Sequence, residues 1–250
     1  MQQKNEVMEI TTGRGSLGAV STGTLALATA AMAALGLLLA PRVYHNYDVV
    51  DCFLTWARAS GGRRPWDIYL TDSGIEMEEI APGGQLNPDY RKLKYDGRVF
   101  RIDPRTGAVE RVDRGLLFAN GIAFGPDEHL YVAETLSGNI YRYECMRGRV
   151  TGKRQLFGNV IEHFDPAELK GPDGMKFGAD GNLYVAVFGQ GDITILGRAG
   201  AVVGRLETEG AMPTNLVFGP RGEKKIYVTE VVTGSVQILD AVTGGLPLHD

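Results

Sequence analysis

The sequence predicts an all-β fold made of short repeated strands joined by tight turns. A strand–turn–strand pattern occurs three times, and its copies are centred on Phe124, Phe177 and Phe218, which are 53 and 41 residues apart. A tyrosine follows these phenylalanines at +7, +7 and +9, so only one turn differs in length. The chain also holds 34 glycines in 250 residues. Most of them lie between short apolar runs, which favours many tight turns over long helices.

Further strands complete each repeat. Third strands are expected at 138–143, 191–196 and 234–239, and fourth strands at 153–157 and 202–206. Upstream, 66–73 matches the second strand of the repeat, and 97–103 and 108–112 form a hairpin. A period of roughly 40 to 50 residues with four strands per unit is typical of β-propeller blades. A β-sandwich does not explain such self-similar units, so we predict a propeller with about three and a half recognisable blades.

The N-terminal part, 1–65, differs from the rest, and 66–250 is expected to be the propeller region. The run 24–40 is nearly all Ala, Leu and Met and predicts an apolar helix just under the length that spans a membrane. It is interpreted as a membrane anchor, as part of a secretory signal, or as a segment that is packed on the domain or disordered. The protein is therefore expected to be anchored or exported, with a cytoplasmic location as the alternative.

Composition excludes several classes of function. The formal net charge of −4 does not indicate a basic surface that would bind nucleic acid, so no nucleic acid is expected as a partner. Two cysteines without CxxC spacing exclude a disulfide framework and a cysteine-based zinc site.

Polar residues at one position of the repeat are the candidate functional residues. Asn120, Asp173 and Thr214 align four residues before the three phenylalanines, and Asn215 follows Thr214. The innermost strands of a propeller begin near its central channel, so we expect these side chains to converge there. Asp72 is a further pocket candidate, while Asn-Gly and Asp-Gly are also ordinary turn dipeptides.

The chain resembles the SMP-30/gluconolactonase/LRE-like family of six-bladed propellers from about residue 66 to 250. The segments that carry the resemblance are 117–124, 171–175, 213–215 and 245–249. The resemblance implies one divalent ion, usually calcium, bound by Asn120 and Asp173, with Asp173 also as the catalytic base. The family's glutamate ligand near its first blade has no counterpart here. The family's segment one strand before 68–69, which supplies an inner strand and its Asn, has no counterpart either. We therefore expect an incomplete propeller whose leading blades are missing or replaced.

The leading hypothesis is a metal-dependent hydrolase of sugar lactones or related esters, similar to gluconolactonases. The cation would polarise the carbonyl, Asp173 would activate water, and Thr214, Asn215 and Asp72 would contact the substrate. The alternative is a non-catalytic binding module with an incomplete metal site. Membrane association through 24–40 and self-association through an open sheet edge are the further partner expectations.

Overall fold

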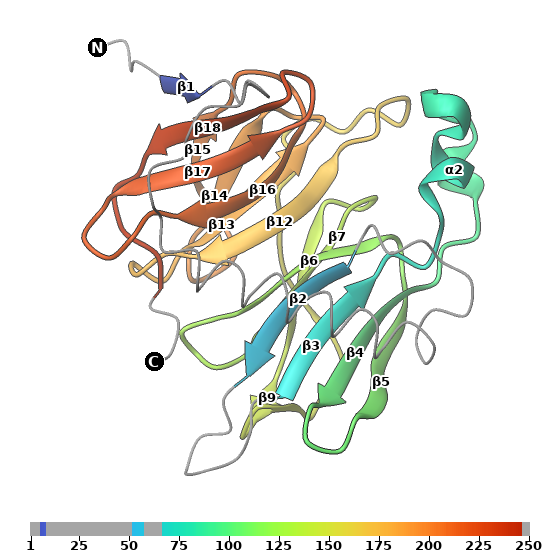
Figure 1. Ribbon diagram of the computed structural model, residues 1–250. Helices are drawn as coiled ribbons and strands as arrows, with labels where there is room; N and C mark the ends of the chain where they lie inside the picture. Colours follow the sequence, from blue (N-terminus) through green and yellow to red (C-terminus); the bar gives the residue numbers. More distant parts are fainter. Residues whose placement is uncertain (1–5, 9–51, 58–66, 247–250) are drawn as a thin grey trace, which may run out of the picture. The chain divides into compact units, whose positions relative to one another are not determined.

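The computed structural model of the protein describes residues 6–8, 52–57 and 67–246 (Figure 1). These residues form four antiparallel four-stranded sheets and one two-stranded hairpin, which confirms the all-β prediction. The apolar helix expected at 24–40 lies outside the described residues. Within the described part, no helix is long and apolar enough to cross a bilayer. Membrane association, export and self-association stay predictions.

The first and fourth sheets each gain a strand that the sequence pattern did not predict. The strands of the first sheet are, in spatial order, β2 (Cys52–Ala57), β3 (Asp67–Asp72), β4 (Gly97–Asp103) and β5 (Ala108–Leu116). Those of the fourth are β16 (Pro213–Phe218), β17 (Lys225–Glu230), β18 (Ser235–Asp240) and β1 (Glu6–Met8). The expectation of three strands in each was therefore wrong, because β2 supplies an inner strand and β1 an outer one.

The second and third sheets follow the predicted pattern. The strands of the second sheet are β6 (Ala119–Phe124), β7 (Leu130–Glu134), β8 (Asn139–Tyr143) and β11 (Gln155–Asn159). Those of the third are β12 (Gly171–Phe177), β13 (Leu183–Phe188), β14 (Asp192–Leu196) and β15 (Val202–Glu207). A hairpin of β9 (Cys145–Met146) and β10 (Arg149–Val150) was not predicted. It reaches the first sheet, where the Tyr69 hydroxyl donates to Gly148 O at 2.8 Å.

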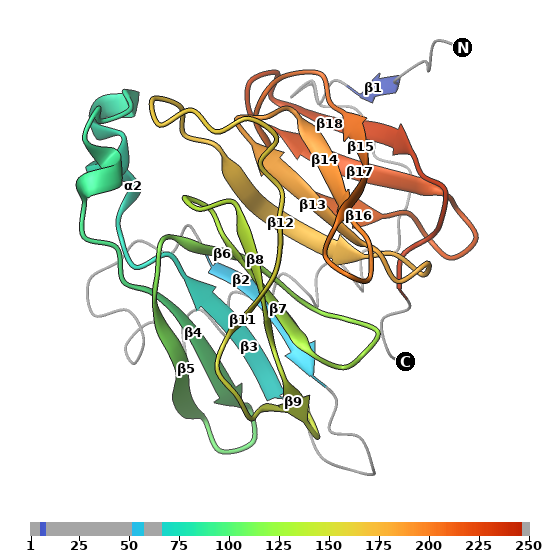
Figure 2. The same ribbon diagram turned by 180° about the vertical axis from the view of Figure 1, so that it is seen from behind.

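The inner strands of successive sheets contact one another, β2 with β6, β6 with β12, and β12 with β16 (Figures 1 and 2). Each sheet runs outward from its inner strand through consecutive antiparallel neighbours. Four-stranded sheets that repeat in this way, inner strand beside inner strand, have the organisation of propeller blades.

The repeated aromatic residues join neighbouring sheets. A tyrosine on the second strand of one sheet meets the phenylalanine on the inner strand of the next, edge to face. The ring-centroid distances are 5.5 Å for Tyr69 and Phe124, 4.9 Å for Tyr131 and Phe177, and 5.0 Å for Tyr184 and Phe218. Such pairs add about 0.5–1.5 kcal/mol beyond the burial of their area. The phenylalanines and tyrosines that recur in the sequence are therefore the residues that connect neighbouring blades.

Two of these tyrosines also form hydrogen bonds with the turn before them. The Tyr131 hydroxyl donates to Asp127 Oδ2 at 2.9 Å, and the Tyr184 hydroxyl donates to Asp180 Oδ2 at 3.1 Å. The same two aspartates accept backbone N–H groups inside their turns. Asp127 and Asp180 thus serve the turns, because Asp side chains readily bond the backbone two residues on.

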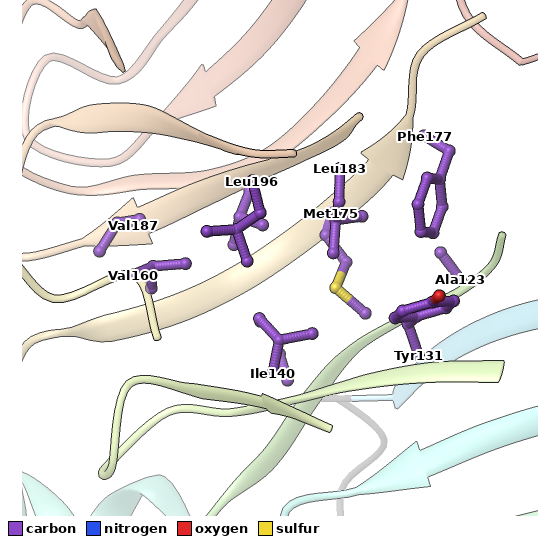
Figure 3. Packing of buried hydrophobic residues seen from close by; sticks show 11 residues of the cluster. Ala123, Tyr131, Ile140, Val160, Met175, Phe177, Leu183, Val187 and Leu196 are labelled. Carbon is purple, nitrogen blue, oxygen red and sulfur yellow. The ribbon is translucent and has the colours of Figure 1, made fainter. Parts of the chain in front are cut away.

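The largest apolar cluster fills the space between the second and third sheets (Figure 3). Met175 extends from β12 toward Ile140 and Tyr131 of the second sheet, and it is 1 % exposed. Val185 and Val187 face the same cluster from β13. This packing holds β12 against the second sheet and so fixes the distance between β12 and β6.

Candidate functional site at the bulges of the inner strands

Each of the three inner strands of the repeat carries a β-bulge at the predicted site position. The residues between which the register shifts are Ala119 and Ile122 in β6, Pro172 and Met175 in β12, and Pro213 and Asn215 in β16. Asn120, Asp173 and Thr214 lie inside these intervals. A bulge inserts one extra residue and re-aims its side chain, which is why bulges are frequent next to active sites.

Glycines let the inner strands approach closely at this level. A Cβ on Gly121 would lie 2.0 Å from Asp173 O, and one on Gly174 would lie 2.2 Å from Asn215 Oδ1. Neither distance is compatible with a side chain. The Asn-Gly and Asp-Gly dipeptides therefore do more than form turns, since each places a polar residue beside a position where only glycine fits.

Asn120 is held on both sides by threonines. It is 8 % exposed; its Nδ2 donates to Thr135 Oγ1 at 3.1 Å, and its main-chain O accepts from Thr71 Oγ1 at 2.6 Å. The Thr135 hydroxyl donates its single proton to Pro172 O at 2.8 Å. The Asn120 atom that faces Thr135 must therefore be the donor Nδ2, and Oδ1 is the amide atom left to bind a ligand.

Thr135 is the residue that sequence reasoning missed. Its hydroxyl links the Asn120 side chain to the carbonyl of the residue directly before Asp173. It is 5 % exposed and lies directly after β7. Nothing in the residue type distinguishes it from the many threonines of β-rich sequence, and only its position opposite the bulge in β6 indicates this role.

The remaining predicted residues are placed differently from one another. Asp173 is half-buried at its bulge, and Asn215, against Gly174, accepts Leu216 N at 2.8 Å through Oδ1. Thr214 Oγ1 lies 2.8 Å from Thr229 Oγ1. The structure therefore brings Asn120, Asp173 and Asn215 to three adjacent strands.

Asp72 lies at the end of β3, and both of its carboxylate oxygens have partners. Oδ1 accepts Gly74 N at 2.9 Å, and Oδ2 forms an ion pair with Arg98 Nη1 at 3.1 Å. The geometry gives this carboxylate a structural task and provides no support for substrate contact.

The long loop between β3 and β4 covers the ends of the strands that carry these residues. It holds α2 (Met77–Ile80), η1 (Pro82–Gly84) and η2 (Tyr90–Lys92). Its apolar side chains pack against residues one or two positions from the ends of β6, β7 and β12, namely Phe118, Leu136 and Leu169. Arg91 fixes this loop by donating to Leu136 O at 3.0 Å and to Pro166 O at 3.2 Å.

Phe118, which packs under the β3–β4 loop, has a strained backbone conformation. Its φ is +69°, which is unusual for a bulky residue, and it is 8 % exposed. Its carbonyl accepts Thr135 N at 3.0 Å. Strain of this kind clusters at functional sites, where the surrounding structure over-determines it. Here it turns the chain into β6 two residues before Asn120.

The donor chemistry of the site suits a hard cation. Asn120 Oδ1 and the Asp173 carboxylate are oxygen donors from adjacent strands, and calcium and magnesium bind oxygen. Among the described residues, no group of three or more His, Cys, Asp or Glu side chains is placed to hold a metal ion. A cation at this position would therefore complete its coordination with main-chain oxygens, water or substrate.

Several known proteins of similar sequence are described as lactonases. The chain is 32% identical over 167 residues to the gluconolactonase of Zymomonas mobilis, covering 64% of this chain and 46% of that protein. It is 31% identical over 188 residues to lactonase drp35 of Staphylococcus aureus, covering 68% and 56%. The chain thus spans about half the length of the curated relatives it matches.

Solved structures agree on the fold. Regucalcin of Agrobacterium tumefaciens, described as a calcium-binding protein, superposes with a TM-score of 0.60 at 18% identity, covering 78% of this chain and 62% of that one. A luciferin-regenerating enzyme gives a TM-score of 0.60 at 15% identity, covering 83% and 66%. The family model described as the SMP-30/gluconolactonase/LRE-like region matches residues 78–232. That match covers more than half of the chain, which therefore belongs to the SMP-30/gluconolactonase/LRE-like family.

Proposed function

We propose that this protein hydrolyses sugar lactones or related esters with the help of one divalent cation. The proposal draws on the lactonase relatives and on the oxygen donors that β6 and β12 bring to the same level. Calcium is the preferred ion because the donors are an amide oxygen and a carboxylate. The regucalcin neighbour, described as calcium-binding, points in the same direction.

The observation that carries the proposal is the orientation of Asn120. Thr135 takes the Nδ2 side of the amide, so Oδ1 is the atom presented for coordination. Gly121 next to it allows β12 to come close enough for Asp173 to share a ligand with Asn120. If Asn120 only formed a turn, neither the hydrogen bonds of Thr135 nor the close approach of β12 at Gly121 would be needed.

In this proposal each residue of the site has its own role. Asn120 and Asp173 hold the cation, which when bound polarises a carbonyl and acidifies water. Asp173 takes the proton of the attacking water as general base. Asn215 and Thr214, on the adjacent strand, bind substrate hydroxyls. Asp72 is left out of this proposal because both of its oxygens are engaged.

Calcium binding by calorimetry together with hydrolysis of gluconolactone tests the proposal. Asn120→Ala and Asp173→Ala should each weaken calcium binding, and Asp173→Ala and chelation should each abolish hydrolysis. Asp89→Ala is the matched control, because it removes an exposed carboxylate on the β3–β4 loop. Hydrolysis that Asp173→Ala leaves unchanged would refute the assigned mechanism.

A second candidate function is a binding module without catalysis. It is favoured by one observation: in the described residues, Asp173 is not joined by two further acidic, histidine or cysteine side chains. Such a protein would bind calcium and a sugar lactone in calorimetry and would return the lactone intact. Turnover of the lactone at a rate that depends on calcium would exclude it.

A further inference from the structure

A surface cavity of about 190 Å³ lies between the second and third sheets, lined by residues of both. The second sheet contributes Arg142 from β8 and three residues of β11, and the third sheet contributes the turn between β14 and β15. The lining residues are Arg142, Gln155, Leu156, Phe157, Arg198 and Ala199. None of them belongs to the site formed by Asn120 and Asp173.

Next to the residues that line this cavity, two glycines bring the second and third sheets into backbone contact. A Cβ on Gly158 would lie 2.3 Å from Gly200 O, and one on Gly200 would lie 1.7 Å from Phe157 O. Phe157 in turn packs edge to face on Tyr131, with ring centroids 4.9 Å apart. The two arginines are therefore presented from elements whose separation is fixed.

Arg142 has an unused hydrogen-bonding edge. Among the described residues, its Nε is the one buried side-chain nitrogen or oxygen without a hydrogen-bond partner. Its Nη2 lies 3.7 Å from Glu144 Oε1, which is an ion-pair distance and too long for a hydrogen bond. By contrast, Arg101 places Nε and Nη2 at 3.0 and 2.8 Å from Glu110 Oε2. Because Nε is closed to solvent, a ligand in the cavity can meet only the rest of the Arg142 side chain, which is one-third exposed.

Arg198 faces the same cavity with its charge uncommitted to any carboxylate within the described residues. Its Nη2 donates to the main-chain Asp180 O at 2.9 Å, and its guanidinium lies against Gly181. Glu144, near Arg142, also accepts from Gln155 Nε2 at 3.4 Å. The residues that line the cavity include two arginines and no acidic residue.

We propose that this cavity binds a carboxylate carried on a small apolar body. Arg142 and Arg198 both line the cavity, and guanidinium groups form strong charge-assisted hydrogen bonds with carboxylates. Leu156, Phe157 and Ala199 supply the apolar wall.

Calorimetry of the full-length chain with benzoate as probe tests this proposal. Arg142→Gln and Arg198→Gln should each weaken benzoate binding about tenfold, and the double variant should not bind it. Arg221→Gln, in the exposed turn before β17, should bind benzoate as the wild type does. Benzamide, which has the same shape without the charge, should bind at least about tenfold more weakly than benzoate. Far-UV circular dichroism of each variant checks that the fold is retained.

The Asp173→Ala variant separates this site from the proposed lactonase site. It should keep full benzoate binding, and the double arginine variant should keep calcium binding and lactone turnover. Benzoate binding that survives in the double arginine variant, or that is lost in Asp173→Ala, would overturn the proposal. So would a wild type that does not bind benzoate. Inorganic phosphate that binds as tightly as benzoate would show that the apolar wall has no part.

Discussion

Substitution of Gly121 by alanine should damage the candidate site through a single added methyl group. The new Cβ would lie 2.0 Å from Asp173 O and 3.1 Å from Asp173 C, where ordinary contacts begin at 3.4 Å. One of the two strands must therefore move by roughly 1.4 Å, because the nearest atoms are backbone and cannot rotate away. The φ of Gly121 is not in the left-handed region, so the effect is steric overlap alone.

Overpacking of this kind costs about 1–3 kcal/mol of unfolding free energy. Urea unfolding of Gly121→Ala with chelator present should show this loss, and calorimetry should show weaker calcium binding because Asn120 and Asp173 are pushed apart. Gly152→Ala is the matched control, since its Cβ would meet nothing within 4 Å. A Gly121→Ala protein that is as stable as the wild type and binds calcium equally well would refute the close approach of β6 and β12.

Three further outcomes are expected. Thr135→Val should lower calcium affinity roughly tenfold by releasing the Asn120 amide, while Thr135→Ser should retain it, both measured by calorimetry. Met175→Ala should cost about 2–5 kcal/mol in urea unfolding, against little change for Met146→Ala, whose residue is 66% exposed. Burial alone would raise the pKa of Glu230, but hydrogen bonds from Thr233, Met212 and Val232 hold that pKa below its ordinary 4.5. Stability should therefore fall as the pH drops below 4.5, and Glu230→Gln should flatten this fall in urea unfolding measured from pH 6 to pH 3.

The repeat in the sequence was enough to predict the second and third sheets, because their strands and turns share residue types and spacing. The inner strand β2 was missed because Cys52–Ala57 lacks the Phe-Gly pair with which the other three inner strands end. Its place in the first sheet depends on backbone pairing with β3, which a residue pattern does not encode.

The candidate site was predictable only in part, for a physical reason. Asn120 and Asp173 could be selected because their residue types supply oxygen ligands at one repeat position. Asp72, at the end of β3, was also selected as a polar residue, but Arg98 from another strand forms an ion pair with its carboxylate. Thr135 acts through a hydroxyl that bridges two sheets. Contacts between residues distant in sequence decide these roles, so the pattern along one strand could not reveal them.

The edge-to-face aromatic pairs have a consequence for how such a chain can change in evolution. Each repeat carries both halves of a joint, a phenylalanine for the blade before it and a tyrosine for the blade after it. A duplicated repeat therefore brings the phenylalanine and the tyrosine that it needs to contact both neighbouring blades. After a deletion, the tyrosine of the blade before and the phenylalanine of the blade after can still form a pair. Whole repeats are the natural unit of gain and loss in this architecture, and a site built across adjacent inner strands changes its set of ligands each time that happens.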